Sequence, residues 1–169
     1  MNAIEYRKPK AADLDGIFKL WWEMQSEHVA YDPVWYGLRS KRECRPLCLK
    51  WLRKNLSDQN AVIFIAIADG HPIGMVLGFL TNRPPVHRQI KVLAIENAVV
   101  AKPWRRRGVL RQLMKLITAE GATRGATIIK LTVHAANLAR KAYEKLGFTC
   151  HELSMGKYVR LRVSNRHAK

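Results

Sequence analysis

The chain has 169 residues, of which 48% are hydrophobic and 25% charged, a composition typical of one packed globular domain and unlike that of a disordered chain. No apolar run approaches the roughly 20 residues that a membrane span needs, and the N-terminus lacks the apolar core of a signal peptide, so we expect a cytoplasmic protein with no membrane partner. The net charge of +17 favours an anionic partner, either a nucleic acid or a phosphorylated cofactor.

The N-terminal part of the sequence predicts one strand and two helices. Residues 4–7 predict a short strand, and Asp13 is a candidate N-cap for the helix that follows. A loop is expected over residues 31–36, because a proline disfavours helix at the residue before it. The second helix is expected to begin near Ser40 and to break or bend near Pro46.

The middle of the chain predicts three strands. The apolar run 61–68 is followed by Asp69-Gly70, a hairpin turn signal, and residues 71–80 form the returning strand. Residues 81–87 contain two adjacent prolines and predict an exposed loop before a strand that ends at Val100.

The C-terminal part predicts alternating helices and strands in a mixed sheet covered by helices. A single domain is expected over residues 1–163, followed by a basic tail over 164–169. The expected elements are a helix over 108–120, a strand over 128–133, a helix over 137–146, and two final strands over 149–155 and 158–163.

Three cysteines are present, Cys44, Cys48 and Cys150. They cannot all pair within the chain and show no metal-ligand spacing, so we expect reduced, partly buried thiols and no metal site.

A basic turn follows the strand that ends at Val100. Arg105, Arg106, Arg107 and Gly108 precede apolar positions at helical spacing. A helix N-terminus has free N–H groups and the positive end of the helix dipole, and it binds phosphate oxygens. The glycine allows the backbone to approach a ligand closely, and the arginines add charge-assisted hydrogen bonds. The pattern predicts a pyrophosphate site.

Two segments carry a family resemblance. The basic turn, Arg105 to Leu110, reads RRRGVL, and a second segment, Ala139 to Phe148, reads ARKAYEKLGF. In this order they resemble the phosphate-binding motif Arg/Gln-x-x-Gly-x-Gly/Ala and the C-terminal hallmark of the GNAT superfamily of N-acetyltransferases. The likeness extends from Ile4 to about Val159. It implies an α/β (α+β) GNAT fold, with a mixed central β-sheet that is splayed between strands 4 and 5 and flanked by helices.

The resemblance implies that acetyl-CoA (coenzyme A) is the cofactor and that it lies in the splay. Backbone groups of two strand residues would contact the pantetheine arm, and the basic turn would contact the phosphates. The residues that the resemblance assigns to cofactor binding are Val99, Val100, Arg105, Arg106, Arg107, Gly108, Val109, Asn137 and Tyr143.

Two positions depart from the family pattern. Leu110 stands where the motif has Gly or Ala, and its larger side chain would fit if it turned into the core. The family places an Asn seven residues before the tyrosine of the second motif. That position is Ala136 here, and Asn137 follows it. Asn137 either reaches the pantetheine arm or caps the helix.

Tyr143 and Glu96 are the catalytic candidates. A phenol with a pKa near 10 can give a proton to the departing sulfur of coenzyme A, whereas the alternative for Tyr143 is a half-buried helical tyrosine. Glu96 lies where several GNAT enzymes place a carboxylate, and it could accept the proton of the attacking ammonium or bind the substrate. The alternative for Glu96 is a surface ion pair.

The acceptor site is expected near the first two helices. Trp22, Tyr31, Trp35 and Asn97 are the candidates for substrate binding, since aromatic rings can enclose a cationic or apolar acceptor. His134 suits a proton relay, although a histidine whose hydrogen bonds are satisfied within the protein is the commoner case. Cys150 could carry an acetyl group, but a packed thiol and direct transfer are favoured.

The resulting functional hypothesis is an N-acetyltransferase that transfers an acetyl group from acetyl-CoA to a primary amine by direct attack in a ternary complex. The amine could belong to a small molecule or to a protein. The alternative is a basic nucleic-acid- or ribosome-associated module that keeps the fold, although no nucleic-acid motif is present. A homodimer is an open alternative to a monomer.

Overall fold

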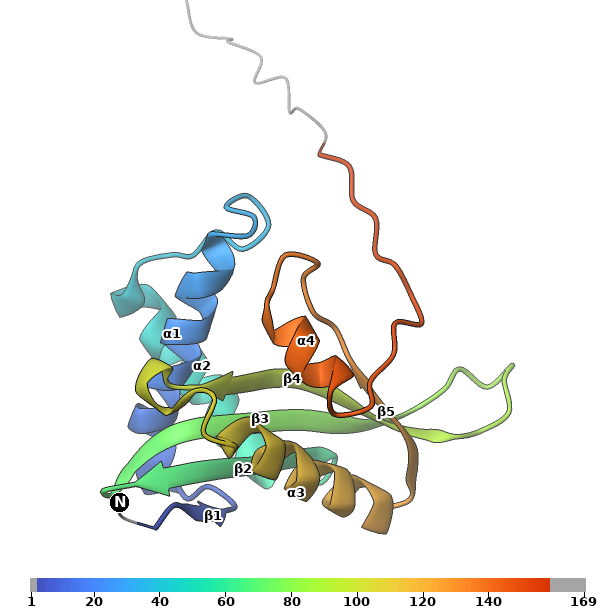
Figure 1. Ribbon diagram of the computed structural model, residues 1–169, viewed down its shortest axis with the longest axis horizontal. Coiled ribbons are helices and arrows are strands. Elements are labelled where there is room, and N and C mark those ends of the chain that lie inside the picture. Colours follow the sequence, from blue (N-terminus) through green and yellow to red (C-terminus); the bar gives the residue numbers. More distant parts are fainter. Residues whose placement is uncertain (1–2, 159–169) are drawn as a thin grey trace, which may run out of the picture.

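A five-stranded mixed sheet forms the centre of the protein, in the computed structural model that describes residues 3–158 (Figure 1). Neighbouring strands follow the chain order, β1 to β5. The first four strands are antiparallel, whereas β5 runs parallel to β4. The mixed sheet that the sequence predicts is confirmed. The strands are β1 (Glu5–Arg7), β2 (Ala61–Ala68), β3 (His71–Asn82), β4 (Lys91–Val100) and β5 (Ala126–Leu131).

Helices cover both faces of the sheet (Figure 1). The first two helices and the third pack into separate apolar clusters on the sheet, which makes three layers. No helix among the described residues is long and apolar enough to span a bilayer. The helices are α1 (Leu14–Val29), α2 (Lys41–Ser57), α3 (Val109–Thr123) and α4 (Ala139–Glu144), and single 3-10 turns lie at η1 (Ala11–Asp13) and η2 (Lys102–Trp104).

The first helix begins differently from the expectation, and the second helix runs differently from it. Asp13 does not cap α1 with its side chain. Its carboxylate instead accepts hydrogen bonds from the Arg7 guanidinium at 2.7 and 2.9 Å and from the Lys10 N–H at 2.6 Å. Helix α2 begins after Ser40, as predicted, in a capping box with Glu43. It continues through Pro46 without a break, because the buried face of the helix holds it against the core.

The hairpin between β2 and β3 forms at the predicted turn. Asp69 and Gly70 have φ angles of 51° and 76°, as a two-residue turn that follows the twist of the strands requires. The antiparallel register continues from this turn to the pair Ala61 and Phe79.

The C-terminal prediction is partly wrong. Residues 149–158 contain no strand, although a strand was expected over 149–155. Their side chains find no partner strand or core, so that Leu153 and Met155 are 87% and 94% exposed. Figure 1 shows this segment running away from the sheet after α4. The strand expected over 158–163 and the tail lie outside the described residues, apart from Tyr158.

Candidate active site

A gap opens between β4 and β5 in the half of β4 that follows Ile95. The parallel pairing extends from Lys91 and Ala126 to Ile95 and Leu131. Strand β4 then continues to Val100, paired only with β3, while the chain after β5 turns toward α4. On this half of β4, the backbone groups that are directed away from β3 therefore face the gap rather than a second neighbouring strand. The splay predicted between strands 4 and 5 is confirmed.

A β-bulge lies where the gap begins. Ile95 pairs with Gly78 and Asn97 pairs with Leu77, so Glu96 is the extra residue. Bulges reverse the alternation of side chains and re-aim them near functional sites. Glu96 is exposed, while Asn97 is 8% exposed and buried. The sequence pattern gives no signal for this bulge, because it depends on pairing with β3.

The end of β4 joins the two apolar clusters. Val99 packs in the cluster with α1 and α2, whereas Val100 packs in the cluster with α3. The Val100 carbonyl accepts a hydrogen bond from the Arg105 Nε at 2.8 Å. The strand end is thereby fastened to the turn that follows it.

The basic turn has an unusual backbone. Arg106 and Gly108 both have positive φ angles, 63° and 82°, and a Cβ added at Gly108 would meet no protein atom within 4 Å. Among the described residues, no backbone N–H from Arg106 to Arg111 has a hydrogen-bond partner. Successive N–H groups in such a turn form an anion-binding concavity, and here it lies at the positive end of the α3 dipole.

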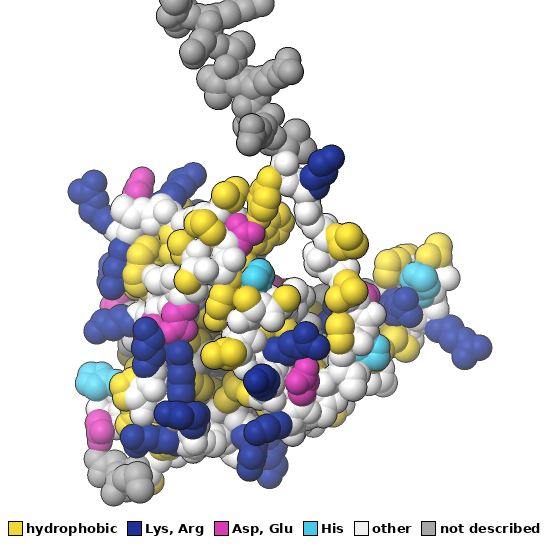
Figure 2. Space-filling view, turned by 45° about the horizontal axis from the view of Figure 1, so that its top comes forward, with side chains coloured by type: hydrophobic (Ala, Val, Ile, Leu, Met, Phe, Trp, Pro, Cys, Tyr) yellow, Lys and Arg dark blue, Asp and Glu magenta, His cyan; other side chains and the backbone are white. Residues whose placement is uncertain are grey.

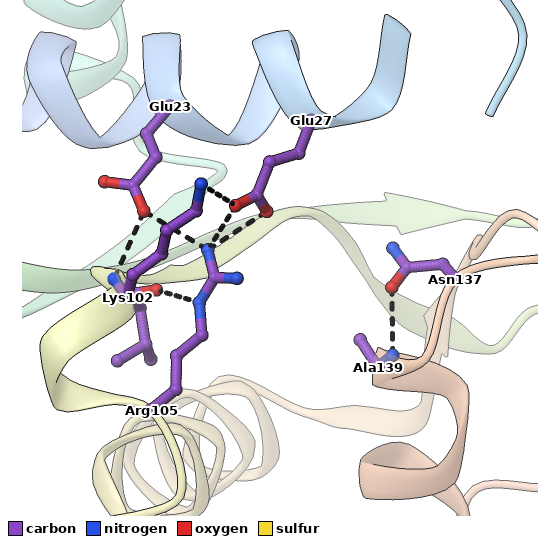
Figure 3. A network of polar contacts seen from close by, with 7 residues as sticks. Glu23, Glu27, Lys102, Arg105, Asn137 and Ala139 are labelled. Carbon is purple, nitrogen blue, oxygen red and sulfur yellow. Dashed lines mark hydrogen bonds and ion pairs between the residues drawn. The ribbon is translucent and has the colours of Figure 1, made fainter. Parts of the chain in front are cut away.

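The side chain of Arg105 is directed toward α1 rather than into this concavity (Figure 3). Its guanidinium lies 3.0 Å from both oxygens of Glu27 and 3.3 Å from Glu23, on α1. The backbone N–H of Lys102 also donates to Glu23 at 3.1 Å, and the Lys102 ammonium lies 3.3 Å from Glu27. The backbone N–H of Arg105 donates to Lys102. This network attaches the basic turn to α1.

Arg107 and Leu110 make different contacts around the turn. The Arg107 guanidinium lies 5.4 Å from the Trp104 ring centroid, a cation–π distance. Leu110 is half-buried against the α3 cluster. The larger side chain at Leu110 thus packs against the core, as expected, and its backbone N–H has no acceptor among the described residues.

Helix α4 lies across the gap from β4. The side chain of Asn137 accepts a hydrogen bond from the Ala139 N–H at 2.9 Å (Figure 3), so Asn137 caps the helix with its oxygen. At the other end, the N–H groups of Gly147 and Phe148 donate to Glu144 and Tyr143, and the φ of Gly147 is 89°. This closing pattern stops the helix at the predicted glycine.

Tyr143 is buried on α4. Its side chain is 9% exposed, and its ring makes an edge contact with Phe148 at 6.1 Å between centroids. Burial raises the pKa of Tyr143 above its ordinary 10.0, because a charged phenolate is disfavoured away from water. The raised pKa keeps the hydroxyl protonated at neutral pH, and because this hydroxyl donates to no described residue, it is available as a donor.

Four rings, which we call the aromatic bridge, connect the end of α1 and its loop to the segment between β5 and α4. The Tyr31 and His134 rings stack at 5.3 Å with 7° between their planes. Tyr36 lies edge-on to His134 at 6.0 Å, and His28 lies 5.8 and 5.2 Å from Tyr31 and Tyr36. The His134 Nδ1 accepts the Ala136 N–H at 3.2 Å. The bridge therefore spans the two sides between which the strands separate.

The other candidates lie elsewhere. Trp22 packs against Phe18 in the cluster of α1 and α2, with the Lys41 ammonium 6.0 Å from its ring, and Trp35 is 75% exposed. Cys150 is exposed and unpacked, contrary to expectation. Burial raises the pKa of the Cys48 thiol to about 12, which excludes it as a nucleophile at neutral pH.

Sequence reasoning missed Glu23 and Glu27. A signal was present, since two carboxylates four residues apart lie on one helix face and repel each other unless a cation lies between them. Arg105 and Lys102 supply that cation. The structure brings Glu96, Asn97, Val99 and Val100 to one side of the gap, the basic turn to its end, and Asn137 and Tyr143 to the other side.

Comparison with known proteins identifies the family. The model of the acetyltransferase (GNAT) family matches residues 14–148. A comparison with curated protein sequences gives no match. Similar solved structures include the tetramutant of the BH1408 protein from Bacillus halodurans, with a TM-score of 0.82 at 19% identity over 92% of this chain and 99% of the other.

Two further structures belong to acetyltransferases. Glucosamine-6-phosphate N-acetyltransferase from Arabidopsis thaliana has a TM-score of 0.67 at 16% identity, over 94% of this chain and 99% of the other. An aminoglycoside N-acetyltransferase, AAC(6')-Iy, in complex with CoA has a TM-score of 0.70 at 21% identity, over 96% and 97%. At these identities the structures show the fold, while the family model covers most of the chain. The protein therefore belongs to the acetyltransferase (GNAT) family.

Proposed function

We propose that the protein is an acetyl-CoA-dependent N-acetyltransferase that acts on a primary amine by direct attack in a ternary complex. The observation that carries the proposal is the row of unpartnered N–H groups from Arg106 to Arg111 at the end of the β4–β5 gap. Tyr143 lies on α4, which borders the same gap. Membership of the acetyltransferase family and a solved relative that contains CoA support the choice of cofactor.

The residues of the basic turn fit a pyrophosphate. The N–H groups of Arg106, Arg107, Gly108, Val109 and Leu110 would donate to its oxygens, and the space beside the Gly108 Cα would let the phosphates approach the backbone. Arg106 and Arg107 are exposed and add positive charge. Arg105 has a different role in this proposal: it holds the turn against α1, so that the concavity is preorganised before the cofactor arrives.

Strand β4 and α4 would hold the rest of the cofactor. The backbone N–H of Ala101 donates to Ile73 on β3. By the alternation of an antiparallel pair, the backbone groups of Val99 are therefore directed to β3 and those of Val100 to the gap, where β4 has no β5 partner. The Val100 carbonyl is taken by Arg105, which leaves fewer groups at that residue for the pantetheine arm. Asn137 caps α4 through its oxygen, and its amide nitrogen is the group that could reach the cofactor.

Bound acetyl-CoA supplies an acetyl group activated as a thioester. Tyr143 would act as the general acid: its hydroxyl proton moves to sulfur when the carbon–sulfur bond breaks. The raised pKa of Tyr143 keeps that proton in place across the neutral range. We therefore expect that activity falls through ionisation of Tyr143 only above about pH 10.

The acceptor amine would enter from the side of α1. Glu96 is an exposed carboxylate at the bulge where the gap begins, and it would accept the ammonium proton directly or through water, since an amine attacks only after losing a proton. Tyr31, as part of the aromatic bridge, would wall this side. Trp22 and Trp35 are weaker candidates for substrate binding than Tyr31. Trp22 packs into the core cluster, and Trp35 is exposed. The acceptor is a small molecule or a protein amine.

Turnover with a panel of amines tests the proposal. Purified protein, acetyl-CoA and a panel of small amines and lysine peptides are incubated, and the released thiol and the acetylated product are measured by a colorimetric thiol assay and mass spectrometry. We expect thiol release that depends on one class of amine and is lost in the Glu96→Gln variant at neutral pH. Thiol release without any acetylated amine, or acetylation that passes through a covalent acetyl–protein, would contradict the direct mechanism.

A further inference from the structure

The outward face of α2 carries a concentration of positive charge that the proposed acetyl transfer does not use. The helix contains six Lys or Arg and one acidic residue, Glu43. All six basic residues are exposed: Lys41, Arg42, Arg45, Lys50, Arg53 and Lys54. On the face that it displays, Figure 2 shows more Lys and Arg than Asp and Glu side chains.

The packing of α2 fixes the direction of these charges. The residues that it buries, which include Cys48, Leu49 and Leu52, pack into the cluster with α1. Lys50, Arg53 and Lys54 are spaced three and four residues apart, so they are neighbours on the opposite surface. Arg42 lies toward the start of the helix, and a helical rise of about 1.5 Å per residue gives a basic row about 18 Å long.

Most of the positive charges in this row have no acidic partner among the described residues. Arg45 pairs with Asp15 at 2.6 Å, and Glu43 is bonded to Ser40 in the capping box. Arg42, Lys50, Arg53 and Lys54 form no ion pair with any residue in the range 3–158. Like charges at this spacing cost a few tenths of a kcal/mol per pair, a cost that an anionic partner removes.

We propose that these four residues, the α2 basic face, bind the phosphate backbone of a nucleic acid. Backbone phosphates are recognised by rows of Lys and Arg without any base-specific contact, which matches a face that has charge and no reading motif. This inference is independent of acetyl transfer, because α2 contributes no residue to the β4–β5 gap.

A membrane surface and an acidic protein are two other possible anionic partners, and both fit the α2 basic face less well. An amphipathic helix that lies on a membrane inserts an apolar face, but the apolar face of α2 is buried in the protein core. A protein interface has a desolvated centre rich in aromatic residues and poor in Lys. The one large apolar side chain exposed on α2 is Leu47, at 57%. The face therefore lacks the centre that a protein partner needs.

The expected salt dependence of nucleic-acid binding follows from the release of counterions from the phosphates. Four neutralised phosphates give a slope of log K against log salt of about −3.6, which lowers the affinity about 150-fold between 50 and 200 mM salt. Other basic residues can make the total slope steeper. Removing the α2 basic face should make the slope shallower by about 3.6.

The test compares two variants that each lose four positive charges. One replaces the α2 basic face (R42Q, K50Q, R53Q and K54Q), and glutamine keeps the helix propensity of the residues it replaces. The control replaces four exposed basic residues elsewhere that make no ion pair with a described residue: R83Q, R88Q, K115Q and K157Q. Fluorescence anisotropy is measured with labelled duplex DNA, duplex RNA and single-stranded RNA at about 50 to 200 mM salt, and the acetyl-CoA-induced shift in Tm is measured on the same preparations.

We expect the wild type and the control to bind at least one nucleic acid, and the α2 variant to bind at least 10-fold more weakly with a shallower slope. The preferred nucleic acid identifies the source of the phosphates. If the acetyl-CoA-induced shift in Tm is unchanged in the α2 variant, the fold of that variant is intact. If acetyl-CoA shifts the Tm of none of the three proteins, the result counts against the acetyl-CoA proposal and not against nucleic-acid binding. Equal weakening in both variants, absence of binding at 50 mM salt, or tighter binding to anionic lipid vesicles or an acidic peptide than to nucleic acid would overturn the inference.

Discussion

Replacing Gly108 by alanine separates the cost of its backbone conformation from its proposed role in binding phosphate. Its φ is 82° and a Cβ there would meet no protein atom within 4 Å, so the cost to folding is the left-handed conformation alone, about 1–2 kcal/mol. For a domain of this size that lowers the Tm by about 2–8 °C. Gly70 is a matched control, because its φ is 76° and its surroundings are equally open. Gly70→Ala should lower the Tm by the same amount.

Only Gly108→Ala should weaken acetyl-CoA binding. A Cβ in the concavity would displace the phosphate from at least one N–H, and a charge-assisted hydrogen bond contributes about 1.5–3 kcal/mol, or about 10- to 150-fold in affinity. At a cofactor concentration about 100-fold above the wild-type Kd, binding stabilises the wild type by about 2.7 kcal/mol. The variant should gain about 0.3–1.4 kcal/mol, whereas Gly70→Ala should keep the full gain.

Differential scanning fluorimetry with and without acetyl-CoA measures both effects on the three proteins. If Gly108→Ala keeps the full cofactor-induced gain while losing the same intrinsic stability as Gly70→Ala, the phosphates do not lie against this turn, and the assignment of the concavity is refuted.

Three further changes test the catalytic group and two structural contacts. Tyr143→Phe should lower kcat about 100-fold with an unchanged acetyl-CoA Kd in calorimetry, and a wild-type rate would reduce Tyr143 to a packing residue. Asp13→Asn should lower the free energy of unfolding in urea by about 2–4 kcal/mol, because it leaves the partly buried Arg7 guanidinium with only the exposed Glu5 as a charged partner; a loss below about 1 kcal/mol would count against this. Burial lowers the pKa of His28 below 6.5, so the unfolded chain binds a proton first and stability falls as the pH drops through about 6.5. His28→Gln should flatten that dependence between about pH 5 and 8, and an unchanged slope would assign it to other groups.

Local pattern was sufficient for much of the fold. The turn at Asp69-Gly70, the start of the second helix near Ser40 and the stop at Gly147 each depend on a few neighbouring residues, and all three were predicted at the correct positions. The splay between strands 4 and 5 came from the family resemblance rather than from any local pattern. The turn, the helix start and the helix stop could be anticipated because the physical causes of each lie within a few neighbouring residues.

The rest depends on contacts between distant segments. Arg105 was expected to face the phosphates, but its partners, Glu23 and Glu27, lie about eighty residues earlier in the chain. The bulge at Glu96 exists only in the register with β3. The segment expected as a strand over 149–155 forms no ladder with β5, the strand at the edge of the sheet, and whether a segment pairs with an edge depends on contacts between distant parts of the chain.

The central claim is that the turn from Arg106 to Leu110 binds the pyrophosphate of coenzyme A. Isothermal titration calorimetry with acetyl-CoA and with S-acetylpantetheine, which lacks the pyrophosphate and the nucleotide, tests it directly. Loss of two charge-assisted hydrogen bonds corresponds to at least about 100-fold in affinity, so acetyl-CoA should bind saturably with one site per chain and S-acetylpantetheine at least about 100-fold more weakly. Equal affinities for the two compounds, or no binding of acetyl-CoA at millimolar concentration, would contradict the account.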